Sequence, residues 1–239
     1  MARPAFGRIL LKLSGEVLAG SRRFGVDPAR AKALAQEISS ARDLGVQVAV
    51  VIGGGNIIRG NKAANRGMDR VSADYLGMLA TIINAITLQD ALEKEGCEVR
   101  TLTAIAISQL AEPYIRRRAL RHLEKGRVII IAGGTGNPYF STDTAAALRA
   151  TEIEADVVLK GTKVDGVYDR DPETSEGAKR YEKLTFQKVI EDGLNVMDLT
   201  AVTLCKENDL PIVVFDINVP GNLVRILSGD RVGTRVGFR

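Results

Sequence analysis

"RVIIIAGGTGN", residues 127–137, joins an uninterrupted apolar run to a loop that contains three glycines. A run rich in Val and Ile that stops at glycine is typical of a strand buried on both faces of a mostly parallel sheet. The loop continues through residue 145 with little side-chain bulk and many hydroxyl groups. This stretch therefore predicts a buried strand that carries a polar, glycine-rich loop to one edge of a sheet.

Similar apolar runs recur along the chain, and segments with helical periodicity separate them. The expected strands are residues 8–13, 46–52, 98–105, 127–132, 155–160 and 211–215. Asp27 and Pro28 suit the N-cap and first turn of a helix, and Gly45 is expected to end that helix. Strands that alternate with helices predict a three-layer α/β/α sandwich around a mostly parallel central sheet. No linker divides the chain, so we expect a single domain over residues 1–239.

The longest expected helix covers residues 72–95. Its centre, "YLGMLATIINAITL" (residues 75–88), is apolar on nearly every side. A helix of this kind is buried all round. The pattern fits two interpretations equally: a helix in the interface of a homo-oligomer, or a simple core helix.

Composition excludes several classes of protein. His122 is the only histidine, which rules out a zinc site with several histidines, and we expect it at the surface. Cys97 and Cys205 lie far apart outside any CxxC pair, which fits a reducing compartment and gives no metal site. No run approaches the roughly 18 apolar residues of a membrane helix, and no cleavage site follows the N-terminal segment. We therefore expect a cytoplasmic protein that does not bind membranes.

The net charge of +4 raises the question of nucleic-acid binding. The only basic run is "RRRALR", residues 116–121. Aromatic residues make up 5% of the chain and tryptophan is absent, so side chains on which bases could stack are scarce. We interpret the run as a solvated helix face and do not expect nucleic-acid binding.

Glycine-rich loops follow four of the expected strands. They are "KLSG" (12–15), "GGGN" (53–56), "GGTGN" (133–137) and "KGTKVDGVYDRDP" (160–172). In open α/β sheets ligands bind outside the carboxyl ends of the strands, and glycine lets backbone amides approach an anion closely. The P-loop motif GxxxxGK[ST] is absent, as is GxGxxG after the first strand. The loops therefore predict a polyphosphate site spread over several loops, and argue against P-loop kinases and nicotinamide enzymes.

Lys12 interrupts the apolar run "ILLKL". A buried ammonium group destabilises the fold unless it reaches solvent or an anion. Its position next to Ser14 and Gly15 favours a lysine directed at a transferring phosphate. The alternative is a lysine on an edge strand, with its stem packed and its ammonium group in water.

Five segments together resemble the uridylate (UMP) kinases of bacteria, in the amino acid kinase superfamily. They are "ILLKLSGE" (9–16), "VIGGGN" (51–56) with Arg59, "GTGNPYFSTD" (134–143), "VVLKGTKVDGVYDRDP" (157–172) and "VMDLTA" (196–201). The resemblance runs from about residue 8 to the end of the chain. It implies transfer of the ATP γ-phosphate to UMP, giving UDP and ADP, with Mg²⁺ carried by ATP. Such enzymes act in pyrimidine nucleotide and CTP biosynthesis.

The resemblance also implies roles for individual residues. The residues implied for ATP are Lys12, Leu13, Ser14, Gly15, Gly55, Arg59, Thr162, Tyr168 and Asp171. Those implied for UMP are Gly54, Asp74, Thr135, Gly136, Asn137, Pro138, Tyr139, Phe140, Ser141 and Thr142. The implied catalytic residues are Lys12, Arg59, Asp143, Lys160 and Asp198. We name no protein ligand for the metal, because Mg²⁺ usually keeps its waters and rides on substrate phosphates.

Some of these residues have structural alternatives. Asp143 and Asp198 each precede or begin an expected helix and suit an N-cap. Tyr168 could anchor its loop instead of contacting the base. Asp74 lies on an otherwise apolar helix, which favours its implied role of binding the ribose hydroxyls.

Regulation is implied more broadly. Bacterial UMP kinases are typically homohexamers that UTP inhibits and that GTP activates in many cases. The segment linked to GTP control corresponds here to Gly20, Ser21, Arg22, Arg23, Phe24 and Gly25. A solvated turn is the alternative reading of the two arginines.

Two other functions remain open at the level of sequence. One is another amino acid kinase that phosphorylates a carboxylate or carbamate, against which the carboxylate of Asp74 argues. The other is a non-catalytic regulatory protein that binds nucleotides on the same fold, against which Lys12, Lys160 and Asp143 argue.

Overall fold

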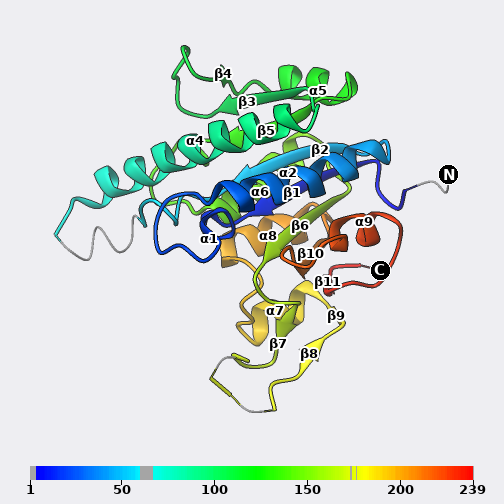
Figure 1. Cartoon of the computed structure of the whole chain (residues 1–239). Helices are drawn as coiled ribbons and strands as arrows, with labels where there is room; N and C mark the ends of the chain where they lie inside the picture. The colour runs from blue at the N-terminus through cyan, green and yellow to red at the C-terminus, as the bar shows by residue number, and fades with distance from the viewer. Residues whose placement is uncertain (1–3, 60–66, 173, 176, 239) are drawn as a thin grey trace.

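The computed structural model describes residues 4–59, 67–172, 174–175 and 177–238. Its central sheet has the strand order β4-β3-β5-β2-β1-β6-β10-β11-β9 (Figure 1). The expected strands are confirmed, with small shifts at their ends. They are β1 (Arg8–Leu13), β2 (Gln47–Ile52), β3 (Val99–Thr103), β5 (Val128–Ala132), β6 (Val157–Thr162) and β10 (Ile212–Asp216). All of these pair in parallel, so their carboxyl ends share one edge of the sheet.

Short strands that the sequence pattern did not predict extend the sheet. They are β4 (Glu112–Pro113), which is parallel to β3, β11 (Thr234–Val236), which is antiparallel to β10, and β9 (Lys183–Leu184), which is parallel to β11. A separate antiparallel pair, β7 (Val167–Tyr168) and β8 (Arg180–Tyr181), projects from the carboxyl side of β6 (Figure 1). Strands of two or three residues are too short for a periodic pattern to identify.

Helices cover both faces of the sheet, which confirms the three-layer α/β/α sandwich. On one face, α1 (Gly15–Ala19), α2 (Pro28–Asp43), α4 (Arg70–Lys94) and α9 (Asn222–Leu227) share a core with the strands. On the other face, α5 (Arg116–Glu124), α6 (Thr142–Glu152), α7 (Phe186–Glu191) and α8 (Leu199–Glu207) do the same. The caps expected for α2 are confirmed, since Asp27 accepts a hydrogen bond from the amide of Ala29 at 3.0 Å. Gly45 follows the helix with φ of 83°.

Helix α4 corrects the expectation that no segment is long and apolar enough to cross a membrane. By length and composition alone it could cross a membrane, because a few polar residues within 18 do not cancel its apolar character. Core helices of soluble proteins meet the same test. Ile82, Ala85 and Leu88 of α4 pack in the core against the sheet, as a core helix does.

Helix α5 corrects the expectation for His122 and confirms the one for its arginines. His122 is 9% exposed, and its ring contacts Glu112 at 3.3 Å and Arg127 at 3.1 Å. The helix turns Ala119, His122 and Leu123 toward the sheet because these positions recur at helical spacing. The arginines of residues 116–121 lie on the exposed side, which is the solvated face that the sequence predicts.

The polar sequence of residues 169–180 predicts a surface loop. Its last residue, Arg180, instead begins β8, and the amide of Asp169 donates to the carbonyl of Lys179 at 3.1 Å. Glu173 and Glu176 lie outside the described residues.

Candidate active site

The strand register brings two lysines together at the carboxyl edge of the sheet. Lys12 on β1 stands directly opposite Lys160 on the neighbouring strand β6. Both share the strand face of Leu10 and Val158, which belong to the core under α6 and α8. Strand β1 lies between β2 and β6, so the alternative of an edge-strand lysine in water is wrong for Lys12.

Asp143, in the first turn of α6, bridges the two lysines. Its Oδ1 lies 2.5 Å from the Nζ of Lys12, and its Oδ2 lies 3.0 Å from the Nζ of Lys160. Lys160 also donates to the carbonyl of Val196 at 2.6 Å. The side chains of all three charged residues are at most 16% exposed. The cluster therefore carries two ammonium groups and one carboxylate, a net positive charge held near the glycine loops.

Burial and charge act in opposite directions on this cluster. Burial alone would raise the pKa of Asp143, but the ion pairs with Lys12 and Lys160 outweigh it and hold that pKa below its usual value. Burial lowers the pKa of Lys160, and the nearby carboxylate of Asp143 offsets only part of this. The carboxylate therefore stays ionised, while the charged form of Lys160 depends on it.

Asp143 and Asp198 differ in whether they cap a helix. Ser141, not Asp143, is the N-cap of α6, since its hydroxyl accepts from the amides of Asp143 at 2.9 Å and Thr144 at 3.1 Å. The capping alternative is therefore wrong for Asp143, whose side chain is free to hold the lysines. Asp198 does cap α8, accepting from the amide of Ala201 at 2.9 Å.

Asp198 also joins the two helix starts. Its carboxylate accepts from the hydroxyls of Ser141 and Thr144, the second at 3.0 Å. The N-termini of α6 and α8 are thus held side by side at the same edge of the sheet. Helix N-termini carry partial positive charge, so this arrangement adds to the positive potential of the lysines.

Two glycines allow the loops to pack closely. A Cβ on Gly15 would lie 2.3 Å from the Oδ1 of Asn56, and one on Gly54 would lie 2.7 Å from the carbonyl oxygen of Gly77 on α4. Both positions therefore require glycine for packing. Gly55 has no such neighbour, because its nearest contact is the Nε of Arg59 at 3.7 Å. Packing thus explains part of the glycine content that the sequence pattern ascribed to anion binding.

A large cavity opens between α4 and the loop that follows β5. Its volume is about 690 Å³, which is in the range of small-molecule sites. Of the residues implied for UMP, those that line it are Gly54, Asp74, Thr135, Tyr139, Phe140, Ser141 and Thr142. Gly55, Arg59 and Asp198 line it too. Gly136, Asn137 and Pro138, which were also implied for UMP, do not line this cavity.

Asp74 forms one corner of the large cavity. Its Oδ2 accepts from the Nε of Arg70 and from the amide of Tyr139, both at 2.8 Å. The guanidinium of Arg70 lies 5.3 Å from the centre of the Tyr139 ring. Tyr139 has φ of 71°, which a non-glycine residue adopts only when its surroundings hold it there. Asp74 therefore has a structural role in fixing this loop, and the role toward ribose that the resemblance implies stays a prediction.

A second cavity of about 330 Å³ adjoins the first and shares Gly55 and Arg59 with it. Arg59 forms an ion pair with Glu16 at the start of α1, and Lys163 lies 3.7 Å from the same carboxylate. The segment 20–25 contributes Gly20, Arg22 and Arg23 to its lining. The residues implied for GTP control therefore lie beside two residues implied for ATP.

The other residues implied for ATP lie around this edge without lining the two cavities. Leu13 ends β1, and Ser14 and Gly15 lead into α1. Thr162 ends β6, where its hydroxyl donates to the carbonyl of Val164 at 3.0 Å. The hydroxyl of Tyr168 donates to Asp165 at 2.7 Å, the contact expected of a loop anchor. Asp171 follows β7 on the exposed side of its loop.

Sequence reasoning missed several polar residues that form this site. Glu16, Arg70, Thr81, Thr144 and Lys163 line one cavity or the other. Thr81 accepts from the amide of Gly133 at 2.8 Å and so connects α4 to the loop after β5. A hydroxyl within the apolar centre of a helix was a readable signal, as was Arg70 four residues before Asp74. Glu16 and Lys163 left no such signal, because surface charges are common.

Within the part of the chain that the structure describes, no three His, Cys, Asp or Glu side chains gather as a metal site. Asp143 is engaged by two lysines, and Asp198 by two hydroxyls and a helix amide. The residues therefore fit a magnesium ion that arrives with polyphosphate better than one held by a protein cage.

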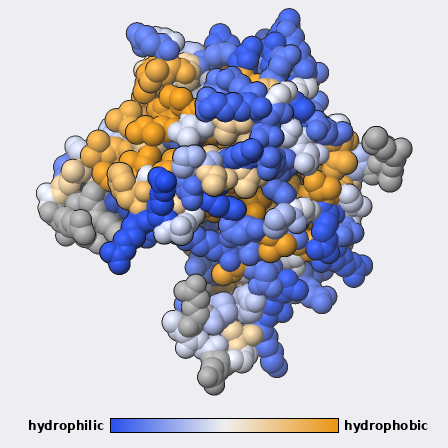
Figure 2. Space-filling model, viewed as in Figure 1, coloured by the Kyte–Doolittle hydropathy of each residue, from blue (hydrophilic) through white to orange (hydrophobic). Residues whose placement is uncertain are grey.

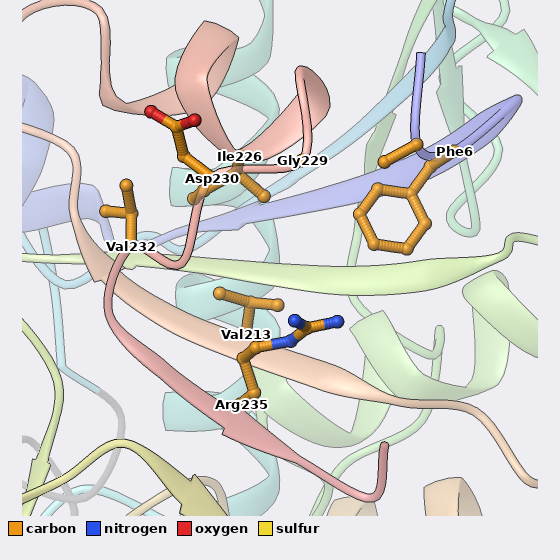
Figure 3. Close-up of a pocket in the computed structure, with 8 residues that line it drawn as sticks. Phe6, Val213, Ile226, Gly229, Asp230, Val232 and Arg235 are labelled. Carbon is orange, nitrogen blue, oxygen red and sulfur yellow. The ribbon is translucent and has the colours of Figure 1, made fainter. Parts of the chain in front are cut away.

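A third cavity lies at the opposite edge of the sheet. Figure 3 shows Phe6, Val213, Ile226, Asp230 and Arg235 around it. Val213 is near the amino end of β10, so the cavity is remote from the glycine loops. Its volume of about 30 Å³ has room for a water molecule but none for a nucleotide.

The amino acid kinase family model matches residues 7–216. A UMP kinase from Bacillus anthracis superposes with a TM-score of 0.94 at 42% identity, with 97% of this chain and 96% of that chain covered. A UMP kinase from Ureaplasma parvum gives 0.91 at 38% identity, covering 99% of each chain. A uridylate kinase from Archaeoglobus fulgidus gives 0.75 at 30% identity, covering 95% of this chain and 99% of that chain.

Proposed function

The chain belongs to the amino acid kinase family, and because it resembles UMP kinases over nearly its whole length, we propose that it transfers the γ-phosphate of ATP to UMP, giving UDP and ADP. Residues 1–239 then act as one amino acid kinase domain. The pathway that this reaction serves is pyrimidine nucleotide and CTP biosynthesis. We further propose a cytoplasmic location.

The observation that carries the proposal is a pair of adjoining cavities that share Gly55 and Arg59. The smaller cavity is lined by Arg59 and Lys163 and suits the polyphosphate of ATP. The larger one is lined by Asp74 and suits a nucleoside monophosphate. The shared residues then lie where the phosphates of the two substrates meet. The resemblance to UMP kinases over nearly the whole chain disfavours the other amino acid kinase reactions.

The acceptor in this reaction is an oxygen of the UMP phosphate. Its second pKa is about 6, so at neutral pH it is largely deprotonated and needs no general base. Phosphoryl transfer then depends on positioning and on neutralising charge. Lys12, Lys160 and Arg59 supply positive charge, and the loop amides supply hydrogen-bond donors. Asp143 sets the positions of both lysines, and Asp198 sets the start of α6. Magnesium bound to the ATP phosphates would neutralise further negative charge.

A turnover assay tests the function. ADP release is measured with ATP and Mg²⁺ and, in turn, UMP, CMP, dUMP, aspartate or N-acetylglutamate. Turnover with UMP well above that with the two amino acids is expected. Absence of turnover with UMP, or faster turnover with a carboxylate, would overturn the proposal. No turnover with any acceptor, together with ATP binding, would favour a regulatory nucleotide-binding protein.

Asp74→Asn is expected to weaken the binding of UMP more than the binding of ATP. The variant keeps an acceptor for the amide of Tyr139 but loses the charge that strengthens hydrogen bonds from the ribose hydroxyls. KM for UMP is expected to rise about 10-fold, since a hydrogen bond to a charged group contributes about 1.5–3 kcal/mol. Asp90→Asn is the control, because Asp90 lies on the same helix in an exposed pair with Lys94. Equal rises in KM for UMP and ATP would contradict a role in ribose binding.

Association is proposed through α4. Figure 2 shows a hydrophobic patch over this helix, and the residues that form it are Tyr75, Leu76, Leu79, Ile83 and Ile86, all at least 37% exposed. Exposed apolar stripes of this kind mark interaction sites. We propose that a second copy of the chain covers the stripe and that the complete assembly is a homohexamer.

Ile83→Glu is expected to break this contact. A buried, unpaired carboxylate opposes association strongly, so the variant is expected to sediment as a smaller species than the parent chain. Val219→Glu, which changes another exposed apolar residue away from α4, is the control and is expected to leave the mass unchanged. A parent chain that sediments as a monomer would contradict the proposed assembly.

Regulation by nucleotides is also proposed. UTP is expected to inhibit, and GTP to activate, with Gly20 to Gly25 as the segment that responds to GTP. In support, Arg22 and Arg23 line the smaller cavity beside Gly55 and Arg59. Rates measured with each nucleotide added at fixed ATP and UMP test both effects.

A further inference from the structure

Two buried asparagines face each other behind the glycine loops. Asn84 lies on the inner side of α4 and is fully buried, and Asn56 follows Gly55 and is 4% exposed. The Nδ2 of Asn84 donates to the Oδ1 of Asn56 at 2.7 Å, and the Nδ2 of Asn56 donates to the Oδ1 of Asn84 at 3.1 Å. Burying an amide destabilises a fold unless hydrogen bonds replace those to water. This reciprocal pair makes that replacement with one N–H group of each amide. The other N–H group of each amide needs a partner of its own.

Those remaining donors hold two backbone segments. The second hydrogen bond of the Asn84 amide goes to the carbonyl of Gly53 at 2.7 Å. The Asn56 amide donates to the carbonyl of Gly25 at 2.8 Å, and the amide of Gly25 donates back to the carbonyl of Asn56 at 2.9 Å. The pair therefore connects α4, the loop after β2 and the turn at Gly25.

The pair also sets the loop after β1. The Oδ1 of Asn56 occupies the space where a side chain on Gly15 would lie, at 2.3 Å from an ideal Cβ. An ideal Cβ on Gly53 would in turn lie 3.3 Å from the amide nitrogen of Gly15. The side chain of Asn56, at the end of the loop after β2, thus packs against the loop after β1. A shift of its side chain would let both loops move.

We propose that the Asn56–Asn84 pair positions the two glycine loops for phosphoryl transfer and couples them to the turn at Gly25. The proposal rests on the kinase function above. Asn84 lines neither of the two site cavities, so it is a positioning residue that acts through Asn56 and Gly53. Donors aimed at a transferring phosphate act mainly in the transition state, and a displacement of about 1 Å can lower the rate about 100-fold. The effect should therefore appear in kcat more than in KM.

The first test compares Asn84→Ala with Leu88→Ala. Leu88 lies one helical turn further along α4, is fully buried in the core, and has none of the contacts to the loops described above. Asn84→Ala is expected to lower kcat about 10- to 100-fold, with KM for ATP and UMP changed by less than about 3-fold. Leu88→Ala is expected to lower the melting temperature while kcat stays within about 2-fold of the parent. An unchanged kcat in a folded Asn84→Ala chain, or an equal loss in Leu88→Ala, would overturn the proposal.

A double variant tests whether the two asparagines act as one unit. Asn56→Ser and Asn84→Ala are each expected to remove most of the contribution that the pair makes to kcat. The double variant is therefore expected to be no more than about 3-fold slower than the slower single variant. A double variant whose loss equals the product of the two single losses would contradict a shared role. If Asn84→Ala does not fold, Asn56→Ser decides by the same kcat criterion. If neither folds, the pair is a requirement for folding and the proposal is rejected.

Hydrogen exchange without substrates separates this proposal from the kinase function. Asn84→Ala is expected to speed exchange of the amides at Gly53 to Asn56 and at Gly25, whereas Leu88→Ala is not. Unchanged exchange in Asn84→Ala would refute the coupling even if UMP is phosphorylated normally by the parent chain. Conversely, absence of UMP turnover in the parent, with faster loop exchange in the variant, would overturn the function and retain the coupling of the loops.

Discussion

Lys12→Ala is expected to lower kcat for UMP phosphorylation about 10²- to 10³-fold, the loss typical of removing one preorganised charge or donor from a transition state. Lys12 is buried on a central strand and held at 2.5 Å by Asp143, so its ammonium group is already in place before substrates bind. KM for UMP is expected to change much less than kcat, because the large cavity that we propose for UMP does not include Lys12. Steady-state rates over a range of ATP and UMP concentrations measure both constants.

Lys12→Met separates the charge of Lys12 from the packing of its stem. The methionine side chain keeps most of the apolar stem and removes the ammonium group. Lys12→Met is therefore expected to lower kcat as much as Lys12→Ala does, with a smaller loss of stability. Lys94→Ala, which removes an exposed lysine from the end of α4, is the control and is expected to retain the parental rate. A normal kcat in either Lys12 variant would refute the proposed role.

Asp143→Asn is expected to cause the largest loss of stability among these variants. It removes the carboxylate that bridges Lys12 and Lys160 and leaves two buried ammonium groups opposite each other. Removing one partner of a buried ion pair lowers the free energy of unfolding by about 3–5 kcal/mol. Denaturant unfolding at neutral pH measures the loss. Asp90→Asn, in an exposed pair with Lys94, is expected to leave the free energy of unfolding nearly unchanged.

The loss in Asp143→Asn is also expected to depend on pH. The folded pKa of Asp143 lies below its usual value of 3.8, so the carboxylate stabilises the fold fully above that pH. This contribution declines as the pH falls below 3.8 and the carboxylate is protonated. The difference in the free energy of unfolding between parent and variant should therefore be largest at neutral pH and narrow in acid. A difference that stays constant down to pH 3 would contradict the assigned ion pairs.

Much of the fold could be predicted because its signals are local. The six long strands and the capped helix α2 follow from apolar runs and cap residues that are neighbours in sequence. The short strands β4, β9 and β11 could not be predicted, since two or three residues form a strand only when a neighbouring strand offers hydrogen bonds. The burial of His122 was missed for a similar reason. Its neighbours in the sequence are arginines, which suggested that His122 faces solvent.

For the candidate site, the sequence indicated which residues carry chemistry but not how they are joined. The lysines at positions 12 and 160 stood out as charges beside apolar runs. That they lie side by side depends on the register of β1 against β6, which no local pattern contains. The same holds for Thr81 and Asn84, whose partners Gly133 and Gly53 are far away in sequence.

By itself, the sequence determined the six long strands and helix α2, the delivery of glycine loops to one sheet edge, and, through its resemblance, the family. These are consequences of residue periodicity and of short motifs. The tertiary structure alone decided the rest: that Asp143 bridges two lysines while Ser141 caps the helix, and that Asn56 and Asn84 hold the loops from behind. Both outcomes depend on side chains that meet only after the strands have paired in register, because hydrogen bonds and ion pairs act over a few ångströms and not along the chain.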